Sequence, residues 1–151
     1  MLPFLSIVTG SGVHIPRIDL APVIRRLCEN YWKQAGGSEE RLNLRLEPLF
    51  LRLDRIRLLS EAVRSLLTGG LSPGFSPEQG AIGVHLWSVD RPEQFANLLI
   101  ADDATELGEE PSAPSITAAR QYAEQAGCRL IWQPARGTVW LIQIMDQDYR
   151  W

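Results

Sequence analysis

Two sets of polar side chains in this chain have the types and spacing that chemistry requires. Arg57, Glu61 and Ser65 recur at every fourth position, so on a helix they share one face. Asp102 and Asp103 follow directly after an apolar stretch that predicts a buried strand. Each set also fits a plain structural role, namely a solvated helix face beside arginines and a polar turn. The residues alone leave both alternatives open.

The cysteines and histidines do not predict a site. Cys28 and Cys128 lie far apart and have no spacing typical of zinc binding, so we expect two reduced, buried thiols. His14 falls in a glycine-flanked segment and His85 in an alternating strand. Isolated histidines of this kind need no functional role, and neither is expected to be a phosphoacceptor.

The composition predicts one globular domain. With 151 residues, 45% of them hydrophobic and 22% charged, the chain can bury a single core. A formal net charge of -3 with scattered Lys and Arg argues against nucleic acid as a partner. No apolar run approaches the roughly 20 residues that span a bilayer, and the first residues lack the basic region of a secretory signal. We therefore expect a cytoplasmic protein without a membrane partner, with one domain over 1–151, an extension at 1–17 and a tail at 146–151.

Three stretches have apolar residues at helical spacing. The first helix is expected to begin after Asp19 as N-cap and to end at the glycine pair 36–37. The second is expected to be capped by Asp54, and the third by Ser115 with a stop at Gly127. The predicted core positions on these helices are Leu20, Val23, Ile24, Leu27 and Tyr31; Ile56, Leu59, Val63, Leu66 and Leu67; and Ile116, Ala119, Tyr122, Ala123 and Ala126.

Alternating or short apolar runs predict six strands. The expected strands are 42–46, 49–51, 81–89, 95–101, 128–133 and 138–145. Pro48 separates the first two, which are expected to form a small strand unit, and the other four are expected to form two hairpins. The predicted fold class is therefore α+β: a two-layer α/β sandwich with about three helices on one face of a mixed, mostly antiparallel sheet.

This order of elements resembles the ATP-binding domain of bacterial sensor histidine kinases, in the GHKL or Bergerat superfamily. The resemblance runs from Ile18 to Met145 and is one of pattern, because the family's motifs are not intact. The segments that carry it are IDLAPVIRRLCENYWKQAGG for the first helix, RLNLRL and LFLRLD for the strand pair, LLSEAVRSLLTGGL for the family's N-box helix, LLIADDATEL for the strand and turn beside the nucleotide, and SITAARQYAEQAGCRLIWQPARGTVWLIQI for the closing helix and hairpin.

The resemblance implies roles for five residues. The family's N-box helix presents Glu and, four residues later, Asn toward Mg²⁺ and the triphosphate; Glu61 is kept as the catalytic or metal-organising carboxylate, and Ser65 replaces Asn as a magnesium ligand. Asp102 matches the Asp that binds the adenine amino group. Ala104 and Glu106 stand in the two following glycine positions of the cofactor site. If those positions require positive φ, each side chain costs about 1 kcal/mol or forces another turn.

The family's lid and phosphate-binding helix start are also altered. The place of its glycine-rich motif is taken by PSAPS at 111–115, where no glycine remains and two prolines lack amide donors. The sequence also contains no helical hairpin with a phosphoacceptor histidine. Autophosphorylation by this chain alone is therefore not expected.

The resemblance implies three alternative functions. The first is a degenerate histidine-kinase-like domain, a pseudo-ATPase with weak or absent nucleotide binding and no cofactor. It acts as a two-component signalling module through protein contact, as in histidine phosphotransferases whose ATPase-like domain binds no nucleotide. Its expected partner is a kinase helical domain, a response regulator, or a second copy docked through the tail. The alternative is a divergent MgATP-binding catalytic domain for histidine-kinase phosphotransfer, and an anti-sigma-type regulator of the same fold is a third.

Overall fold

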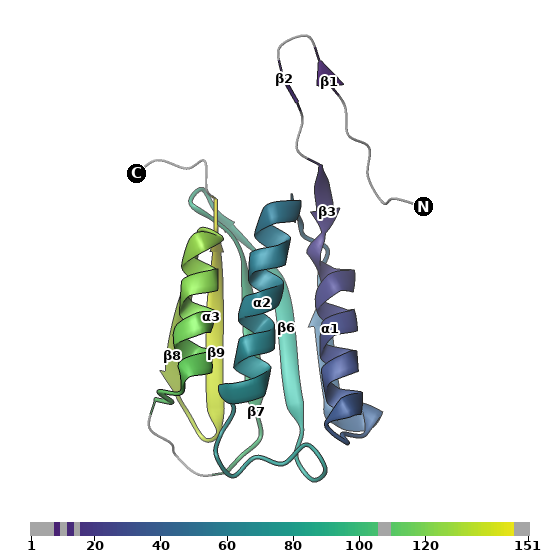
Figure 1. Cartoon of the computed structure of the whole chain (residues 1–151), viewed down its shortest axis with the longest axis vertical. Coiled ribbons are helices and arrows are strands. Elements are labelled where there is room, and N and C mark those ends of the chain that lie inside the picture. Colours follow the sequence, from purple (N-terminus) through teal and green to yellow (C-terminus); the bar gives the residue numbers. More distant parts are fainter. Residues whose placement is uncertain (1–7, 10–11, 14–15, 106–109, 147–151) are drawn as a thin grey trace.

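Three α-helices cover one face of a five-stranded mixed sheet (Figure 1). The computed structural model describes residues 8–9, 12–13, 16–105 and 110–146. Within these residues the large sheet has the order β4-β6-β7-β9-β8, in which β4 and β6 are parallel and every other pair is antiparallel. Its strands are β4 (Leu42–Leu46), β6 (Ile82–Arg91), β7 (Gln94–Asp102), β8 (Cys128–Pro134) and β9 (Thr138–Met145). The predicted two-layer α+β class is confirmed.

Two short strand pairs are separate from this sheet: β1 (Val8–Thr9) with β2 (Gly12–Val13), and β3 (Arg17–Asp19) with β5 (Phe50–Arg52). The expectation that 42–46 and 49–51 form one unit is therefore wrong. Asp19 explains the difference, because its carboxylate accepts a hydrogen bond from Leu49 N at 3.0 Å, and Leu49 O accepts one from Leu20 N at 2.7 Å. These bonds tie the segment after Pro48 to the start of the first helix, while β4 pairs with β6.

The first helix, α1 (Leu20–Gln34), has the N-cap that the sequence predicts. Asp19 accepts a hydrogen bond from Ala21 N at 3.1 Å, which satisfies one of the free amides of the first turn. The helix buries one face against the sheet, including Ile24 and Trp32. A short 3₁₀ turn, η1 (Glu39–Arg41), then leads directly into β4.

The second helix, α2 (Leu53–Gly69), begins one residue before the predicted cap. Arg52 is the N-cap, and Asp54 lies in the first turn, where a negative charge is favourable. The Arg52 guanidinium, 2.6 Å from Asp54 Oδ2, holds the pKa of this carboxyl below its ordinary value. Asp54 therefore acts within the first turn, where its Oδ1 also accepts a hydrogen bond from Arg55 N at 3.0 Å, and not as the N-cap.

The third helix, α3 (Pro114–Gln125), also differs from the prediction at its start. Ala113 is the N-cap and Pro114 occupies the first helical position, so Ser115 is inside the helix and does not cap it. Proline suits that position because its fixed φ is helical and the missing amide would have had no partner.

The predicted helix faces form the core. Of the fifteen predicted core positions, all are buried or packed against the buried cluster. From the sheet, the core receives the inward side chains of every long strand, with Trp140 completely buried. Cys28 and Cys128 are free and buried, as expected, and burial raises the pKa of both thiols.

Arg55 is a buried cation that the sequence does not indicate. It is 3% exposed and lies in the first turn of α2. Its guanidinium donates to Ala126 O at 2.8 Å and to Met145 O at 2.6 Å, and it lies 5.9 Å from the centre of the Phe95 ring. Arg55 therefore joins the start of α2 to the end of α3 and the end of β9.

No helix of the described residues is both long and apolar enough to cross a membrane.

Candidate functional site

The carboxylate of Asp102 is the centre of the candidate site. Asp102 ends β7, at the end of the sheet where α2 also ends, and it is 6% exposed. Its Oδ1 accepts hydrogen bonds from Ser72 Oγ at 3.0 Å, Ala104 N at 3.0 Å and Thr138 N at 3.2 Å. Its Oδ2 accepts one from Ser72 N at 2.7 Å. An ionised carboxylate offers about four lone-pair sites, two on each oxygen, so Oδ1 is fully used and Oδ2 keeps one further site.

Three elements bring these donors together. Ser72 lies in the loop after α2, Ala104 follows β7, and Thr138 opens β9 after the last hairpin turn. Ser72 Oγ and Thr138 Oγ1 are 2.8 Å apart. Since Ser72 uses its hydroxyl proton on Asp102, Thr138 is the donor in this second bond. The two hydroxyls and the carboxylate thus form a continuous chain of hydrogen bonds, from Thr138 Oγ1 through Ser72 Oγ to Asp102 Oδ1.

Gly137 allows this close approach. Its φ is +74°, and a Cβ placed there would meet Asp102 Oδ1 at 2.6 Å, Asp102 O at 2.7 Å and Ala104 O at 2.9 Å. A side chain would therefore strain the backbone and collide with atoms that cannot move away cheaply. Glycine at this turn lets the start of β9 reach the carboxylate.

Ala104 does not have the strained backbone that one alternative predicted. No described residue other than glycine has positive φ, so the turn after Asp102 follows another path. Ala104 contributes its N–H to the carboxylate two residues earlier, which is the geometry of an Asx turn. Glu106, the other replaced glycine position, lies outside the described residues.

Glu61 and Ser65 lie on α2, half-buried and off the helix's core face. Glu61 Oε1 accepts a hydrogen bond from Arg64 Nη1 at 2.7 Å, and Ser65 contributes its carbonyl oxygen to Thr68 Oγ1 at 3.3 Å. No hydrogen bond connects either residue to Asp102 in the described part of the chain. Among those residues, no group of three or more His, Cys, Asp or Glu is placed to hold a metal ion.

The start of α3 packs directly on the end of α2. A Cβ placed on Gly69 would lie 1.8 Å from Ser115 Oγ and 2.7 Å from Ser115 Cβ, so glycine is required for this contact. At the N-terminus of α3, Ile116 N and Thr117 N both donate to Ala113 O, and Pro114 has no amide proton. In the first turn as described, this leaves Ser115 N as the amide without an acceptor.

Sequence reasoning located Asp102 but missed Ser72, Gly137 and Thr138. Their distances along the chain hide them, because Ser72 and Thr138 are 30 and 36 residues from Asp102. One sequence signal could have indicated Thr138: it follows Gly137, a glycine at the end of a hairpin turn, and is a hydroxyl residue at the first position of the next strand.

No family model matches the sequence, and a search of curated proteins finds no relative. Solved structures do match. The histidine kinase domain of the blue-light-activated histidine kinase from Erythrobacter litoralis has a TM-score of 0.69 and 17% identity over 84% of this chain and 61% of its own. The mycobacterial sensor histidine kinase MprB has a TM-score of 0.63 and 20% identity over 85% of this chain and 95% of its own.

A structure described as a bacterial phosphotransferase also matches, with a TM-score of 0.55 and 14% identity over 83% of this chain and 64% of its own. Likenesses at such low identity establish the fold. The chain therefore has the fold of the histidine kinase domains that it matches, as the resemblance in the sequence predicts. It spans 61% of the Erythrobacter domain.

Proposed function

We propose that this chain is a degenerate histidine-kinase-like domain that binds nucleotide weakly or not at all and acts in two-component signalling through protein contact. The hydrogen bonding of Asp102 is the observation that carries the proposal. Four protein donors already bind a carboxylate that is only 6% exposed, so an adenine amino group that binds through Oδ1 would have to displace Ser72, Ala104 or Thr138. Breaking such a bond leaves a buried donor unsatisfied, which costs about 1–3 kcal/mol.

The contact between α2 and α3 supports the same proposal. In the family resemblance, the triphosphate lies at the start of the helix that corresponds to α3. Here Ser115 packs onto Gly69 at that position, and the first turn of α3 offers one amide. A phosphate group needs several converging N–H donors at a helix N-terminus, so this start is poorly suited to one.

Glu61 and Ser65 fit a magnesium site no better. Glu61 is paired with Arg64, and it has 44% of its side chain exposed. A cation would have to compete with the guanidinium, and Ser65 would be its one further ligand on this helix face. Mg²⁺ in such sites is held by carboxylates together with substrate phosphates, so a carboxylate already paired with an arginine does not fit MgATP.

A nucleotide titration tests the proposal. MgATP and MgADP are added to the purified chain up to millimolar concentration, and the thermal midpoint and tryptophan fluorescence are recorded. We expect no saturable shift, whereas ligand at 100 times its Kd would stabilise the fold by about 2.7 kcal/mol. The catalytic domain of a nucleotide-binding histidine kinase serves as the positive control. A saturable shift that Asp102→Asn abolishes would overturn the proposal.

The alternative function is a divergent MgATP-binding catalytic domain of a sensor histidine kinase. It is favoured by the position of Asp102, a carboxylate at the end of a buried strand in the fold of histidine kinase ATPase domains. In this alternative, nucleotide binding would displace Ser72 from the carboxylate. Ser72→Ala should then strengthen nucleotide binding, and an unchanged affinity would count against the alternative.

The proposed partners are a kinase helical domain or a response regulator, in the cytoplasm. Self-association through the aromatic tail is a second proposal, although residues 147–151 lie outside the described part of the chain. Sedimentation of the chain with and without residues 146–151 tests it. The proposal requires that the deletion lowers the dimer fraction.

A further inference from the structure

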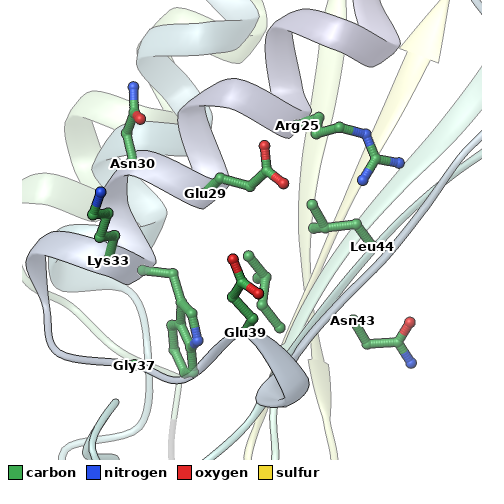
Figure 2. Close-up of a pocket in the computed structure, with 10 residues that line it drawn as sticks. Arg25, Glu29, Asn30, Lys33, Gly37, Glu39, Asn43 and Leu44 are labelled. Atoms are coloured by element: carbon green, nitrogen blue, oxygen red, sulfur yellow. The ribbon is translucent and has the colours of Figure 1, made fainter.

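A groove lies between α1 and β4, at the edge of the sheet opposite to β8. Its volume is about 740 Å³. The strand side is formed by Leu42 and Leu44, and the helix side carries charged residues (Figure 2). The groove therefore lies between a strand, β4, and a helix, α1, an arrangement that suits an extended peptide.

β4 has a free edge along this groove. In the described residues it pairs with β6 and with no other strand. Glu47 N donates to Leu86 O of β6, and backbone groups alternate direction along a strand, so the N–H and C=O groups of Asn43 and Arg45 also point toward β6. The N–H groups of Leu44 and Leu46 and their C=O groups consequently point away from the sheet.

These outward groups can accept another strand. Leu42 N is already used within η1, where it donates to Glu39 O. For Leu44 N and Leu46 N the described residues supply no backbone acceptor. Unpaired edge groups of this kind are a template for strand addition, in which main-chain hydrogen bonds supply affinity and side-chain contacts supply specificity.

The charges of the groove indicate what such a strand would carry. Figure 2 shows Glu29 from α1 and Glu39 from η1 extending into the space between helix and strand. Both are exposed, and no ion pair within 4 Å joins either to a described cation. Arg25 and Lys33 line the groove one helical turn before and after Glu29, so the negative charge is concentrated at its middle.

We propose that the edge of β4 binds an extended peptide of a partner protein, which adds a strand to the sheet and places a lysine or arginine between Glu29 and Glu39. A second copy of this chain is a poorer occupant. Pairing β4 with β4 would bring the same two carboxylates from each copy into one groove, and like charges oppose such pairing. This inference rests on the proposed function in giving the chain a protein partner.

Hydrogen exchange provides the direct test. The probe is a capped peptide of alternating Lys and Thr, about nine residues long, within the usual range of strand lengths. At about ten times the Kd, exchange of the Leu44 and Leu46 amides should slow about tenfold, because only the free fraction exchanges. The Arg45 amide, already bonded to β6, should change little. Binding that leaves Leu44 and Leu46 unprotected would overturn the proposal.

Two variant pairs separate strand addition from general charge attraction. Leu44→Pro removes an outward donor without removing a bond to β6, so peptide affinity should fall about fivefold relative to Leu44→Ala, which keeps the N–H. Glu29→Gln should weaken binding by about two- to fivefold, whereas Glu124→Gln, which removes the same charge from the exposed face of α3, should not. Equal effects within either pair would contradict the proposal.

An alternating Glu and Thr peptide is the opposite-charge control, and it should bind at least about tenfold more weakly. Dimerisation of the free chain through the Leu44 edge would also overturn the proposal. The nucleotide titration is repeated on the same samples. If the peptide does not bind and nucleotide causes no thermal shift, only this inference is refuted. If nucleotide does cause a saturable thermal shift, the proposed function is refuted, and the hydrogen-exchange result still decides whether β4 binds a peptide.

Discussion

One ionisable side chain is buried at each end of β9: the cation Arg55 at its end and the carboxylate Asp102 at its start. Arg55 contacts Met145 O at the end of the strand, and Asp102 contacts Thr138 N at its start. The strand has 8 residues, so these contacts are about 25 Å apart. Neither group has an oppositely charged partner in the described part of the chain: carbonyl oxygens surround Arg55, and N–H and O–H donors surround Asp102.

The comparison teaches that Asp102 has the same kind of surroundings as a purely structural ion. Arg55 fastens the first turn of α2 to the sheet, and Asp102 fastens the loop that follows α2 through Ser72. Arg55 donates to two carbonyl oxygens and to the Cys128 sulfur, and Asp102 accepts from main-chain and hydroxyl donors, which makes burial of each charge tolerable. A residue that resembles a ligand-binding Asp by position is thus bonded like an anchor of the fold.

Replacing Arg55 should have the largest effect. Arg55→Met keeps much of the apolar stem but leaves Ala126 O and Met145 O without their donor, and it should cost about 3 kcal/mol of unfolding free energy. Urea unfolding measures this. Arg57→Met, at an exposed position of the same helix, should change stability by less than about 0.5 kcal/mol. Similar losses for the two variants would refute the anchoring role of Arg55.

Replacing Asp102 should have the next largest effect. In Asp102→Asn the amide oxygen can keep the bonds of Oδ1, but the NH₂ group then faces Ser72 N, which is also a donor. Two facing donors and the lost charge should cost about 2 kcal/mol in urea unfolding. The exposed neighbour provides the control, since Asp103→Asn should be nearly neutral. If the Asp102→Asn variant is as stable as the parent chain, the carboxylate is free to serve a ligand.

The two buried thiols should differ in how they change the unfolding free energy at alkaline pH. Burial, reinforced by Glu29 and opposed by Arg25, raises the pKa of Cys28 from 9.0 to about 12, so above pH 9 the unfolded chain loses a proton that the folded chain keeps. Stability is then complete below pH 9 and falls as pH rises toward 12, by up to about 1.4 kcal/mol per pH unit.

Cys128 behaves differently because Arg55 lies beside it. Burial raises its pKa, while the guanidinium, 3.8 Å from the sulfur, opposes that rise. We therefore expect Cys28→Ala to flatten the alkaline slope of unfolding free energy more than Cys128→Ala does. Equal slopes from urea melts between pH 8 and about 10.5 would contradict an influence of Arg55 on this thiol.

Glu61 should give the smallest effect. Its ion pair with Arg64 is exposed, and exposed pairs contribute at most about 1 kcal/mol and commonly nothing measurable. Glu61→Gln should therefore leave stability within about 0.5 kcal/mol, with or without millimolar Mg²⁺. If Mg²⁺ stabilises the parent chain but not this variant, the residue serves a metal after all.

Local signals predicted most of the fold. Periodic apolar residues identified the three helix faces, and alternation with turn residues identified the two hairpins β6–β7 and β8–β9. The helix starts at Leu53 and Pro114 were missed by a residue or two, because side chains that prefer caps also occur within the first turn.

Long-range pairings could not be predicted in the same way. The partner of β4 is β6, reached only after α2, and nothing near Leu42 specifies that pairing. Asp102 could be singled out by its position after a buried strand, but its bonds depend on where two other loops return in space. Sequence reasoning therefore found the carboxylate and not the donors that define its role.

The parallel pairing of β4 with β6 has a consequence for how the chain folds. The hairpins close loops of a few residues, whereas joining Leu42 to Ile82 closes a loop of about forty, which costs about 2 kcal/mol more in chain entropy. The two hairpins are therefore expected to form first, because the β7–β9 pairing also closes a loop of about forty residues. β4, which among the described residues pairs with one strand and has no hairpin connection, is expected to detach early during partial opening. The edge of the sheet formed by β4 would then open more readily than the central strands.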